Sequence, residues 1–574
     1  MPPDDTDPHE ESDADARSPL LPAPATSTSV PPHHATNKDY ERSTLLGRLG
    51  WYHGVLLVAG VGIVLLALRQ AFSSEDRLLG GKKDSAKWPT NIGYAGPTPT
   101  GSEAFAASTS YPVNFDSSPL NPPAALDTKD FNILHYLGNL APWRSVNHGL
   151  KGTAQIPAGC EVEQVQLLHR HGARYPTSDA GTELFYTDVV SASGFKASGD
   201  LEFLNNWTYK LGGEILTPFG REQLFNLGAS FRVRYGHLLD GAKHKPVFRT
   251  ESQDRMLKSA LNFAAGFFGI PFEDQYHQLI SIEWPGFNNT LAPHMTCKNA
   301  LRPDLTRGPQ RMKEWGRVYL ANTLKRFQPL VEGVELTIEN LFNMQLLCAY
   351  ELVALGGSSF CPLFTEDEWR GFEYAHDIEF WDIFAYGQPA QAAVGKGWVQ
   401  EWLARTLQQP LSEFNSTTNS SLHTPEYFPL DQALVVDATH DVIISAVLTT
   451  LNFTSFSRSG PLPTDHIPSD LSFVTSSISP FAANLHSQVL SCPSSPLTPS
   501  GKEPRFVRWI LNDGLIPLDN LPGCATNDDG LCHLDAFVAA TKQNLESIDW
   551  AYDCLGDYEL TSEPIKDGRP PTAH

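Results

Sequence analysis

A histidine stands between two arginines directly after an apolar run, and this stretch constrains the chain more than any other. The run Val162–Leu168 predicts a buried strand, and Arg170, His171 and Arg174 follow at its carboxyl end. Arginine is always cationic and its planar fork fits phosphate oxygens, whereas a neutral imidazole is a nucleophile. A surface basic cluster is the alternative, but such clusters seldom follow a buried apolar run. We therefore expect the two arginines to hold a phosphoryl group that His171 attacks.

A second apolar run predicts another strand of the same kind. Ala433–Val436 leads to His440 as the first run leads to His171. The patterns between the two runs are mainly helical, with Thr217 as a candidate cap before Pro218. One expected helical face carries Met256, Leu257, Ala260, Leu261, Ala264 and Phe267, and we interpret it as core. Together these patterns predict an α/β sheet flanked by helices, with a mostly helical inserted domain and ligands at the carboxyl edge of the strands.

The charge balance excludes one class of partner. The 574 residues, 41% of them hydrophobic, carry a formal net charge of -23 and a sequence pI near 5.2. Nucleic-acid binding needs clustered Lys and Arg on one face, so we expect no nucleic-acid partner. Most of the carboxylates are expected to keep the protein soluble. An anionic small-molecule substrate must then be attracted by local positive charge.

The first 128 residues predict a membrane anchor between two unfolded segments. Residues 1–50 are rich in Pro, Ser, Thr, Asp and His, which predicts a disordered tail. Residues 51–70 contain the apolar stretch Trp51–Leu68, which predicts a signal-anchor helix of about 27 Å that just spans a thin bilayer. Residues 71–128 predict a Ser/Thr/Pro-rich stalk. A cleaved signal peptide and a buried soluble helix are the alternatives; the long polar segment before the span and the disordered flanks disfavour them.

Cysteines and glycosylation sequons all follow this apolar stretch. The eight cysteines, an even number without metal-ligand spacing, predict disulfides and an oxidising compartment. Lys and Arg flank the span on both sides, so the positive-inside rule does not favour an orientation with the large downstream region outside the cytosol. The cysteines and sequons, which all lie downstream, do favour it. We therefore expect a single-pass membrane protein with its large region in the secretory lumen, the vacuole or outside the cell, or a secreted form if the stalk is cleaved. The sequons lie at Asn206, Asn288, Asn415, Asn419 and Asn452.

The motif RHGARYP from Arg170 resembles the RHGxRxP signature of the histidine acid phosphatases, and its surroundings are similar to their fungal phytase branch. The other similar segments are LTPFGREQ from Leu216, FRTESQDR from Phe248, GFNNTL from Gly286, FCPLFTEDEW from Phe360, ATHD from Ala438 and VRWILND from Val507. The resemblance implies a phosphoglycerate-mutase-like sheet within a catalytic region over residues 129–560. Its α/β core is expected over about 155–180, 244–270 and 430–560, followed by a flexible tail over 561–574.

At the matching positions the resemblance also implies roles. His171 is the nucleophile that becomes a phosphohistidine, Asp441 is the proton donor, and Arg170, Arg174, Arg249 and His440 bind the phosphate. From the residues alone, Arg249 could form a surface ion pair and Asp441 could cap a helix. A proton donor at Asp441 predicts activity that falls as pH rises through the acidic range. No metal or cofactor is expected. The implied disulfides join Cys160 with Cys492, Cys297 with Cys554, Cys348 with Cys361, and Cys524 with Cys532.

Two places depart from the fungal phytase pattern. Where that branch tends to have lysines that bind a highly charged inositol ring, this chain carries Asp179 and Glu183 in the segment from Ser178, and Val442 follows Asp441 where the family often has Asn or Thr. Carboxylates at the rim would repel a substrate that bears many phosphates. We therefore expect an acid phosphomonoesterase of broad specificity, with phytate (myo-inositol hexakisphosphate) as one candidate substrate.

Two other functions fit parts of the sequence. A catalytically weak membrane glycoprotein that only binds phosphorylated ligands should have lost a reacting residue, yet the nucleophile, the proton donor and the expected phosphate ligands are all present. A phosphotransferase of the phosphoglycerate mutase type usually lives in the reducing cytosol, against the cysteines and sequons. The oligomeric state does not follow from the sequence.

Overall fold

The computed structural model describes residues 120–177, 180–492, 504–525 and 527–571. The tail expected over residues 1–50, the signal-anchor over 51–70 and most of the expected stalk lie outside the described residues. Within the described ranges, no helix is both long enough and apolar enough to cross a membrane.

A mixed sheet lies at the centre of the described part of the chain. The strands are β1 (Glu161–Arg170), β2 (Lys196–Ala197), β3 (Val247–Glu251), β4 (His277–Ser281), β5 (Val331–Glu332), β6 (Leu434–Thr439), β7 (Asn484–Ser491), β8 (Arg505–Leu511), β9 (Gly514–Leu515) and β10 (Cys532–His533). The sheet has the order β10-β8-β7-β1-β6-β3-β4, with β9 paired to β8, and β2 pairs with β5 separately. The parallel pairs are β1 with β6, β6 with β3, and β3 with β4, whereas β7 is antiparallel to β1 and β8.

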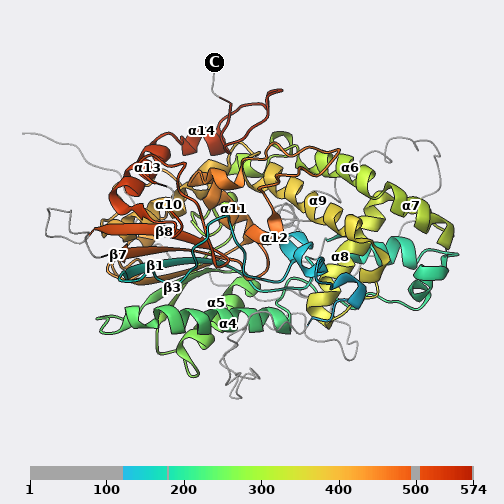
Figure 1. Ribbon diagram of the computed structural model, residues 1–574, viewed down its shortest axis with the longest axis horizontal. Helices are drawn as coiled ribbons and strands as arrows, with labels where there is room; N and C mark the ends of the chain where they lie inside the picture. The colour runs from blue at the N-terminus through green and yellow to red at the C-terminus, as the bar shows by residue number, and fades with distance from the viewer. Residues whose placement is uncertain (1–119, 178–179, 493–503, 526, 572–574) are drawn as a thin grey trace, which may run out of the picture. The chain divides into compact units, whose positions relative to one another are not determined.

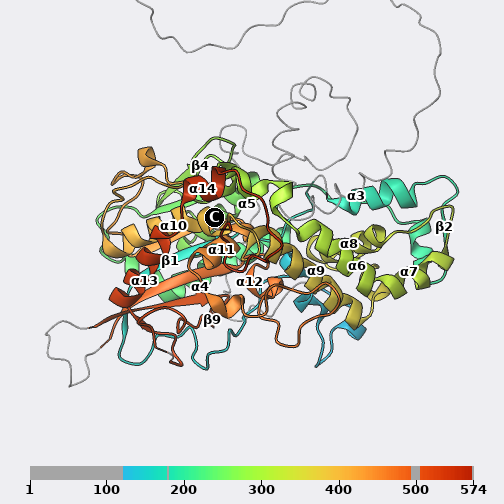
Figure 2. The same ribbon diagram turned by 90° about the horizontal axis from the view of Figure 1, so that it is seen from above.

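Helices cover both faces of this sheet and extend beyond one end of it. The helices are α3 (Gly181–Phe185), α4 (Pro218–Tyr235), α5 (Asp254–Phe268), α6 (Gly308–Tyr319), α7 (Ala321–Phe327), α8 (Ile338–Leu355), α9 (Glu366–Phe384), α10 (Gln391–Leu407), α11 (Asp441–Thr450), α12 (Thr475–Ile478), α13 (Leu534–Glu546) and α14 (Trp550–Leu555). Figure 1 shows α4 and α5 below the strands and α10, α11 and α13 above them. The second view places α3 and α6 to α9 together at the other end (Figure 2). The α/β sheet with a mostly helical insertion is therefore confirmed.

Both strands expected from the apolar runs form, and they are neighbours. The run Val162–Leu168 lies within β1, and Ala433–Val436 overlaps β6. In the parallel pairing of these strands Arg170 stands opposite Thr439. The next residue of each chain segment is a histidine, so the two histidines emerge together at the carboxyl edge of the sheet.

Helices α4 and α5 begin and pack as their residues dictate. Thr217 caps α4 by accepting a hydrogen bond from the Gly220 N–H at 3.0 Å, as expected, and Pro218 is the first helical residue. The two helices cross in close contact because each has a glycine there. A Cβ on Gly228 would lie 2.0 Å from the Phe263 carbonyl oxygen, and one on Gly266 would lie 1.9 Å from that of Phe225.

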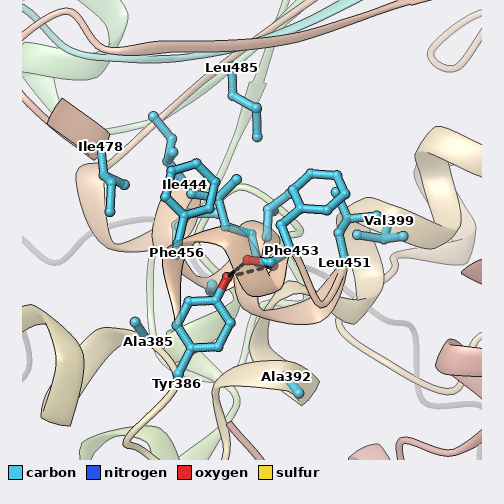
Figure 3. Packing of buried hydrophobic residues seen from close by; sticks show 14 of the residues in the cluster. Ala385, Tyr386, Ala392, Val399, Ile444, Leu451, Phe453, Phe456, Ile478 and Leu485 are labelled. Carbon is cyan, nitrogen blue, oxygen red and sulfur yellow. Dashed lines mark hydrogen bonds between the residues drawn. The ribbon is translucent and has the colours of Figure 1, made fainter. Parts of the chain in front are cut away.

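The largest buried hydrophobic cluster surrounds α11. Figure 3 shows Ile444 of this helix among side chains from several elements, including Val399 of α10 and Leu485 of β7. The Tyr386 hydroxyl donates hydrogen bonds to the carbonyls of Leu448 at 3.3 Å and Phe453 at 2.9 Å, which ties the end of α11 to the loop after α9. Tight packing of this kind restricts the movement of α11, which begins at Asp441.

The four disulfides have the pairing that the resemblance implied. The bonds join Cys160 with Cys492, Cys297 with Cys554, Cys348 with Cys361, and Cys524 with Cys532, so all eight cysteines are paired. The first bond links the start of β1 to the end of β7, and the second links the loop before α6 to α14. Both therefore connect segments that are far apart in the sequence.

The two ends of the described part pack on the rest of it. Leu126, within the expected stalk, is buried, and the Asn121 N–H donates to the Gly356 carbonyl at 2.8 Å. In the expected flexible tail, the Gly568 N–H donates to the Tyr386 carbonyl at 2.9 Å, and its own carbonyl accepts from the Ala392 N–H at 3.0 Å. Residues 120–128 and 561–571 thus contribute to the packing.

Candidate active site

His171 and His440 face each other at the carboxyl edge of the sheet. Their ring centroids lie 5.6 Å apart, at an interplanar angle of 77°, and both side chains are buried. His171 follows β1 directly, and His440 stands between β6 and α11. Parallel pairing brings together two residues that are more than 260 positions apart in the sequence, at the edge where α/β folds bind ligands.

The loop that carries His171 is pressed against the start of α4. A Cβ on Gly172 would lie 2.0 Å from the Gly220 carbonyl oxygen, and one on Gly220 would lie 1.9 Å from the Ala173 carbonyl oxygen. The Ala173 N–H also donates to the Gln223 side-chain oxygen at 2.8 Å. Only glycine permits this approach from either side, so the loop position is set by backbone contact.

The environment of His171 keeps the ring neutral and defines its reactive nitrogen. Burial, followed by the charges of Arg170 and Arg255, holds the pKa of His171 well below its usual value. Its Nδ1 lies 2.8 Å from the Gly172 carbonyl oxygen, which can only accept a hydrogen bond. Nδ1 is therefore the protonated nitrogen, and the lone pair is on Nε2. A neutral imidazole with a lone pair on Nε2 can act as a nucleophile.

His440 is driven to the opposite charge state by two buried glutamates. Its Nε2 lies 2.9 Å from Glu251 Oε2 and 3.2 Å from Glu283 Oε2. Burial alone would lower the pKa of His440, but these carboxylates raise it to about 9. The ring is thus an imidazolium at acidic and neutral pH, and it supplies a positive charge opposite the neutral His171.

The same three side chains are the group in the described part of the chain that could hold a metal ion. One ligand atom from each of Glu251, Glu283 and His440 lies within 4.8 Å of the others. Burial raises the pKa of Glu251, whereas for Glu283 the His440 charge outweighs burial and holds the pKa below its usual value. One ionised carboxylate and one imidazolium balance each other, so the cluster satisfies its charge with its own residues.

Three buried guanidiniums offer donors around His171. The charges of Arg170, Arg255 and Arg174 all contribute to lowering its pKa. The Nε atom of each of these arginines is buried without a hydrogen-bond partner in the described structure. Buried N–H donors are rarely left unpaired, and three of them beside a neutral histidine and an imidazolium could bind a polyvalent oxyanion.

Arg255 is the arginine that the sequence interpretation missed, and Arg249 does not reach the site. In the pairing of β3 with β6, Arg249 lies opposite Asp437. Asp437 precedes His440 by three residues, so this pair lies inside the sheet and not at its carboxyl edge. Its Nε donates to Asp437 and its Nη2 to Glu401, each at 2.7 Å. Arg255 stands in the first turn of α5, beyond the carboxyl end of β3. The expectation for Arg249 is thus corrected: its side chain is committed to an internal ion network.

Asp441 begins α11 and is held by three donors. Its Oδ2 lies 2.7 Å from Arg170 Nη2 and accepts from Asn139 Nδ2 at 2.9 Å, and its Oδ1 accepts from the Val442 N–H at 3.0 Å. Burial alone would raise the pKa of Asp441, but Arg170, then Asn139 and His440, hold it below its usual value. In this structure Asp441 is therefore a carboxylate that neutralises one of the three guanidiniums around His171.

Asn139 joins the two members of this ion pair from a segment far upstream. The Arg170 Nη1 donates to the Asn139 and Ser479 carbonyls, and the Asn139 side chain donates to Asp441. The preceding Gly138 N–H donates to Glu373 Oε2 at 2.6 Å, which fixes this segment on α9. Periodicity gave no signal for Asn139, because it lies in a short helical turn rather than in a regular element.

The rim that departs from the fungal phytase pattern is described only in part. Ser178 and Asp179 lie outside the described residues, while Glu183 is exposed on α3. On the described side, Arg174 Nη1 contacts the Tyr350 hydroxyl of α8 at 3.3 Å. Val442 is buried in the core cluster around α11, so its side chain packs rather than faces the oxyanion site.

Comparisons with known proteins agree with this geometry. The family model described as histidine phosphatase superfamily (branch 2) matches residues 161–512. A phytase A from Emericella nidulans is 30% identical over 425 residues, covering 71% of this chain and 88% of that protein. A phytase from Candida albicans is 29% identical over 451 residues, covering 75% and 89%. Among solved structures, the phytase from D. castellii has a TM-score of 0.61 at 25% identity, covering 76% of this chain and 90% of that one.

Proposed function

Since the chain belongs to the histidine phosphatase superfamily, branch 2, and is a phosphomonoester hydrolase, we propose that it works through a phosphohistidine formed at His171. The observation that carries this proposal is the charge pattern of the site. A neutral imidazole with its lone pair on Nε2 lies among Arg170, Arg174 and Arg255 and opposite an imidazolium. This arrangement matches the needs of phosphoryl transfer, which are a nucleophile and cations for the equatorial oxygens.

The first half-reaction transfers the phosphoryl group to the enzyme. The Nε2 lone pair of His171 attacks phosphorus, the ester P–O bond breaks, and the departing oxygen takes a proton from Asp441. The guanidiniums and the His440 imidazolium hold the phosphoryl oxygens. In the second half, water attacks the phosphohistidine while Asp441 accepts its proton, which releases inorganic phosphate and restores the neutral ring.

Substrate binding resolves the conflict between the ionised Asp441 of the empty site and its role as proton donor. A bound phosphate competes with Asp441 for the hydrogen bonds of Arg170. The negative charge of the phosphate also repels the negative charge of the Asp441 carboxylate. Both changes raise the pKa of Asp441. Activity should therefore be highest at acidic pH and fall as pH rises, because the substrate-bound enzyme loses the proton that the leaving group needs.

Inositol phosphates belong among the substrates to be tested. The relatives from Emericella nidulans and Candida albicans bear the name phytase, which supports phytate as a candidate. The acidic residues Asp179 and Glu183 near the motif support a broader specificity, because carboxylates at a rim disfavour polyanions. We propose an acid phosphomonoesterase that accepts simple phosphate esters as well as inositol phosphates.

We further propose that the catalytic region lies on the lumenal or outer side of a membrane, anchored through residues 51–70. The four disulfides support an oxidising compartment. Three of the sequon asparagines, Asn206, Asn288 and Asn415, are exposed, as glycosylation requires.

The proposed function is tested by His171→Ala in a substrate panel at acidic pH with a chelator present. Phosphate release from p-nitrophenyl phosphate, a sugar phosphate and phytate should fall by a factor on the order of 10³ or more, because the variant lacks the imidazole that accepts the phosphoryl group in this mechanism. A labelled acid-quenched wild-type enzyme should carry phosphate on histidine, and the variant should not. Wild-type rates in the variant would reject the mechanism, and loss of wild-type activity with chelator would indicate a metal.

Asp441→Asn separates the proton-donor role from phosphate binding. The amide cannot donate a proton as an acid, so hydrolysis of an alkyl phosphate should fall by about 10²- to 10⁴-fold, while p-nitrophenyl phosphate, whose leaving group is stable as an anion, should fall less. The decline of kcat with rising pH should disappear for the latter substrate. Equal losses for both substrates would count against Asp441 as the acid.

A further inference from the structure

Glu214 stands beside the oxyanion site in an unusual backbone conformation. Its φ of 69° lies in the left-handed region, which a non-glycine residue adopts only when its surroundings demand it. The Glu214 N–H donates to the Pro176 carbonyl at 2.9 Å, and the Tyr175 N–H donates to the Ile215 carbonyl at 3.0 Å. The segment of Glu214 is therefore hydrogen-bonded to the loop that carries His171, at Tyr175 and Pro176.

The carboxylate of Glu214 binds one of the guanidiniums of the site. Its Oε2 accepts a hydrogen bond from Arg255 Nη1 at 2.9 Å. The glutamate side chain is 37% exposed and that of Arg255 only 6%, so the pair runs from the mouth of the site to its interior. The charge of Glu214 also reaches Arg174: burial alone would lower the pKa of Arg174, but Tyr350 and then Glu214 raise it.

The hydrogen bond with Glu214 occupies Nη1 of Arg255 and leaves its Nε available. The Nε of Arg255 is buried and has no hydrogen-bond partner in the described residues. A long arginine side chain has many rotamers, and a charge-assisted hydrogen bond at Nη1 selects one of them. The left-handed backbone of Glu214 thus has a local consequence: it directs a carboxylate at Arg255 from a segment that is hydrogen-bonded to the loop of His171.

We propose that Glu214 is a positioning residue that holds Arg255 in the orientation that binds the transferred phosphoryl group. The proposal rests on the phosphohistidine mechanism, in which Arg255 is a phosphate ligand. In this role Glu214 acts through Arg255 and does not itself contact the substrate. Its removal should therefore weaken phosphate binding without abolishing the chemistry.

The test compares Glu214→Ala, Glu214→Gln, Arg255→Ala and the Glu214→Ala/Arg255→Ala double variant in the full chain. For Glu214→Ala we expect KM for p-nitrophenyl phosphate and Ki for inorganic phosphate to rise about three- to tenfold, with a smaller change in kcat, since the bond is charge-assisted but partly exposed. Glu214→Gln should recover part of the loss, because its amide oxygen can accept the same hydrogen bond. In the Arg255→Ala background, removing Glu214 should have a much smaller effect than in the wild type.

Thermal unfolding and a matched control separate this role from damage to the fold. Glu335→Ala removes an exposed carboxylate from the loop before α8 and should leave KM and Ki unchanged. If Glu214→Ala does not fold, the same cycle with Glu214→Gln decides the question. Unchanged Ki in Glu214→Ala, or additive losses in the double variant, would overturn the positioning role while the wild type remains active. A wild type that releases no phosphate would instead overturn the proposed function, and this role with it.

Discussion

At the scale of single residues, the site depends on two histidines with the same intrinsic chemistry and opposite charge. His171 is buried among guanidiniums and stays neutral, while His440, 5.6 Å away between ring centroids, is buried against Glu251 and Glu283 and is charged. Burial disfavours the charged form of both rings, so the neighbours decide the difference. In the proposed mechanism the neutral ring attacks phosphorus and the charged ring binds its oxygens.

Replacing Glu283 by Gln should let His440 lose its charge at a lower pH. Phosphate binding should then depend on pH in a range where His440 of the wild type stays charged. With both glutamates present the pKa of His440 is about 9, so its charge is present below that pH and is lost as pH rises through it. Loss of one carboxylate should lower this pKa by at least about one unit. Measured from about pH 4 to about pH 8, the Ki for inorganic phosphate should begin to rise at lower pH in Glu283→Gln than in the wild type.

The isosteric Gln keeps the shape of the pocket, and Glu335→Gln serves as the control for loss of a surface charge. Parallel pH profiles of the wild type and Glu283→Gln would show that Glu251 alone maintains the charge of His440. That outcome would remove Glu283 from the account of phosphate binding.

At the scale of elements, the site is assembled by one strand pairing and one helix crossing. The parallel pairing of β1 with β6 brings His171 and His440 to the same edge. Helix α4 holds the motif loop through Gly220 and Gln223, and α5 carries Arg255. Because α4 and α5 cross through glycines, the spacing of these helices sets the distance between the motif loop and Arg255.

Gly266→Ala should therefore lower both stability and catalytic efficiency. Its Cβ would meet the Phe225 carbonyl oxygen at 1.9 Å, and a backbone atom cannot rotate away as a side chain can. Forcing the helices apart should lower the free energy of unfolding by about 1–3 kcal/mol, as other overpacked substitutions do, and should raise KM as Arg255 moves. Denaturant unfolding and steady-state kinetics measure the two effects.

Gly357→Ala is a suitable control for this substitution. A Cβ there would lie 3.9 Å from the Asn121 carbonyl oxygen, which is ordinary van der Waals contact, and the residue is outside the site. If Gly266→Ala behaved like Gly357→Ala, the close crossing of α4 and α5 would not govern the position of Arg255.

At the scale of the whole molecule, a strongly acidic chain has to bind an anion. The formal net charge of -23 repels phosphate esters at long range, so attraction depends on the buried guanidiniums and the imidazolium at the sheet edge. The expected location of the chain, a membrane anchor at residues 51–70 with the catalytic region on the lumenal or outer side, stays a prediction.

Expression of the full chain in a eukaryotic secretory host tests this location. The protein should stay with membranes after alkaline carbonate extraction, and deletion of residues 51–70 should release it. Peptide N-glycosidase should increase its gel mobility, with smaller shifts after Asn206→Gln, Asn288→Gln or Asn415→Gln, because these exposed asparagines can accept glycans. Membrane association without any glycan would place the catalytic region on the cytosolic side instead.

The sequence by itself determined those parts of the site that are contiguous along the chain. The strand–motif segment from Val162 to Pro176 and the strand–histidine–aspartate segment ending at Asp441 are local, and each points its polar residues past the end of one strand. Their likeness to a known family also predicted the fold and the disulfide pairing. The order of residues along the chain was enough here, because a residue that directly follows a strand lies at the carboxyl edge of the sheet, where α/β folds bind ligands.

Only the tertiary structure decided which distant side chains complete the site. The sequence favoured Arg249 as the phosphate ligand of its segment, but strand register places that arginine inside the sheet. Arg255, six residues later, stands in the first turn of α5 at the edge of the sheet. Glu283 and Asn139 likewise reach His440 and Asp441 from segments more than 150 residues away. Side-chain direction depends on pairing and packing between elements, and neither periodicity nor residue type along one chain encodes them directly.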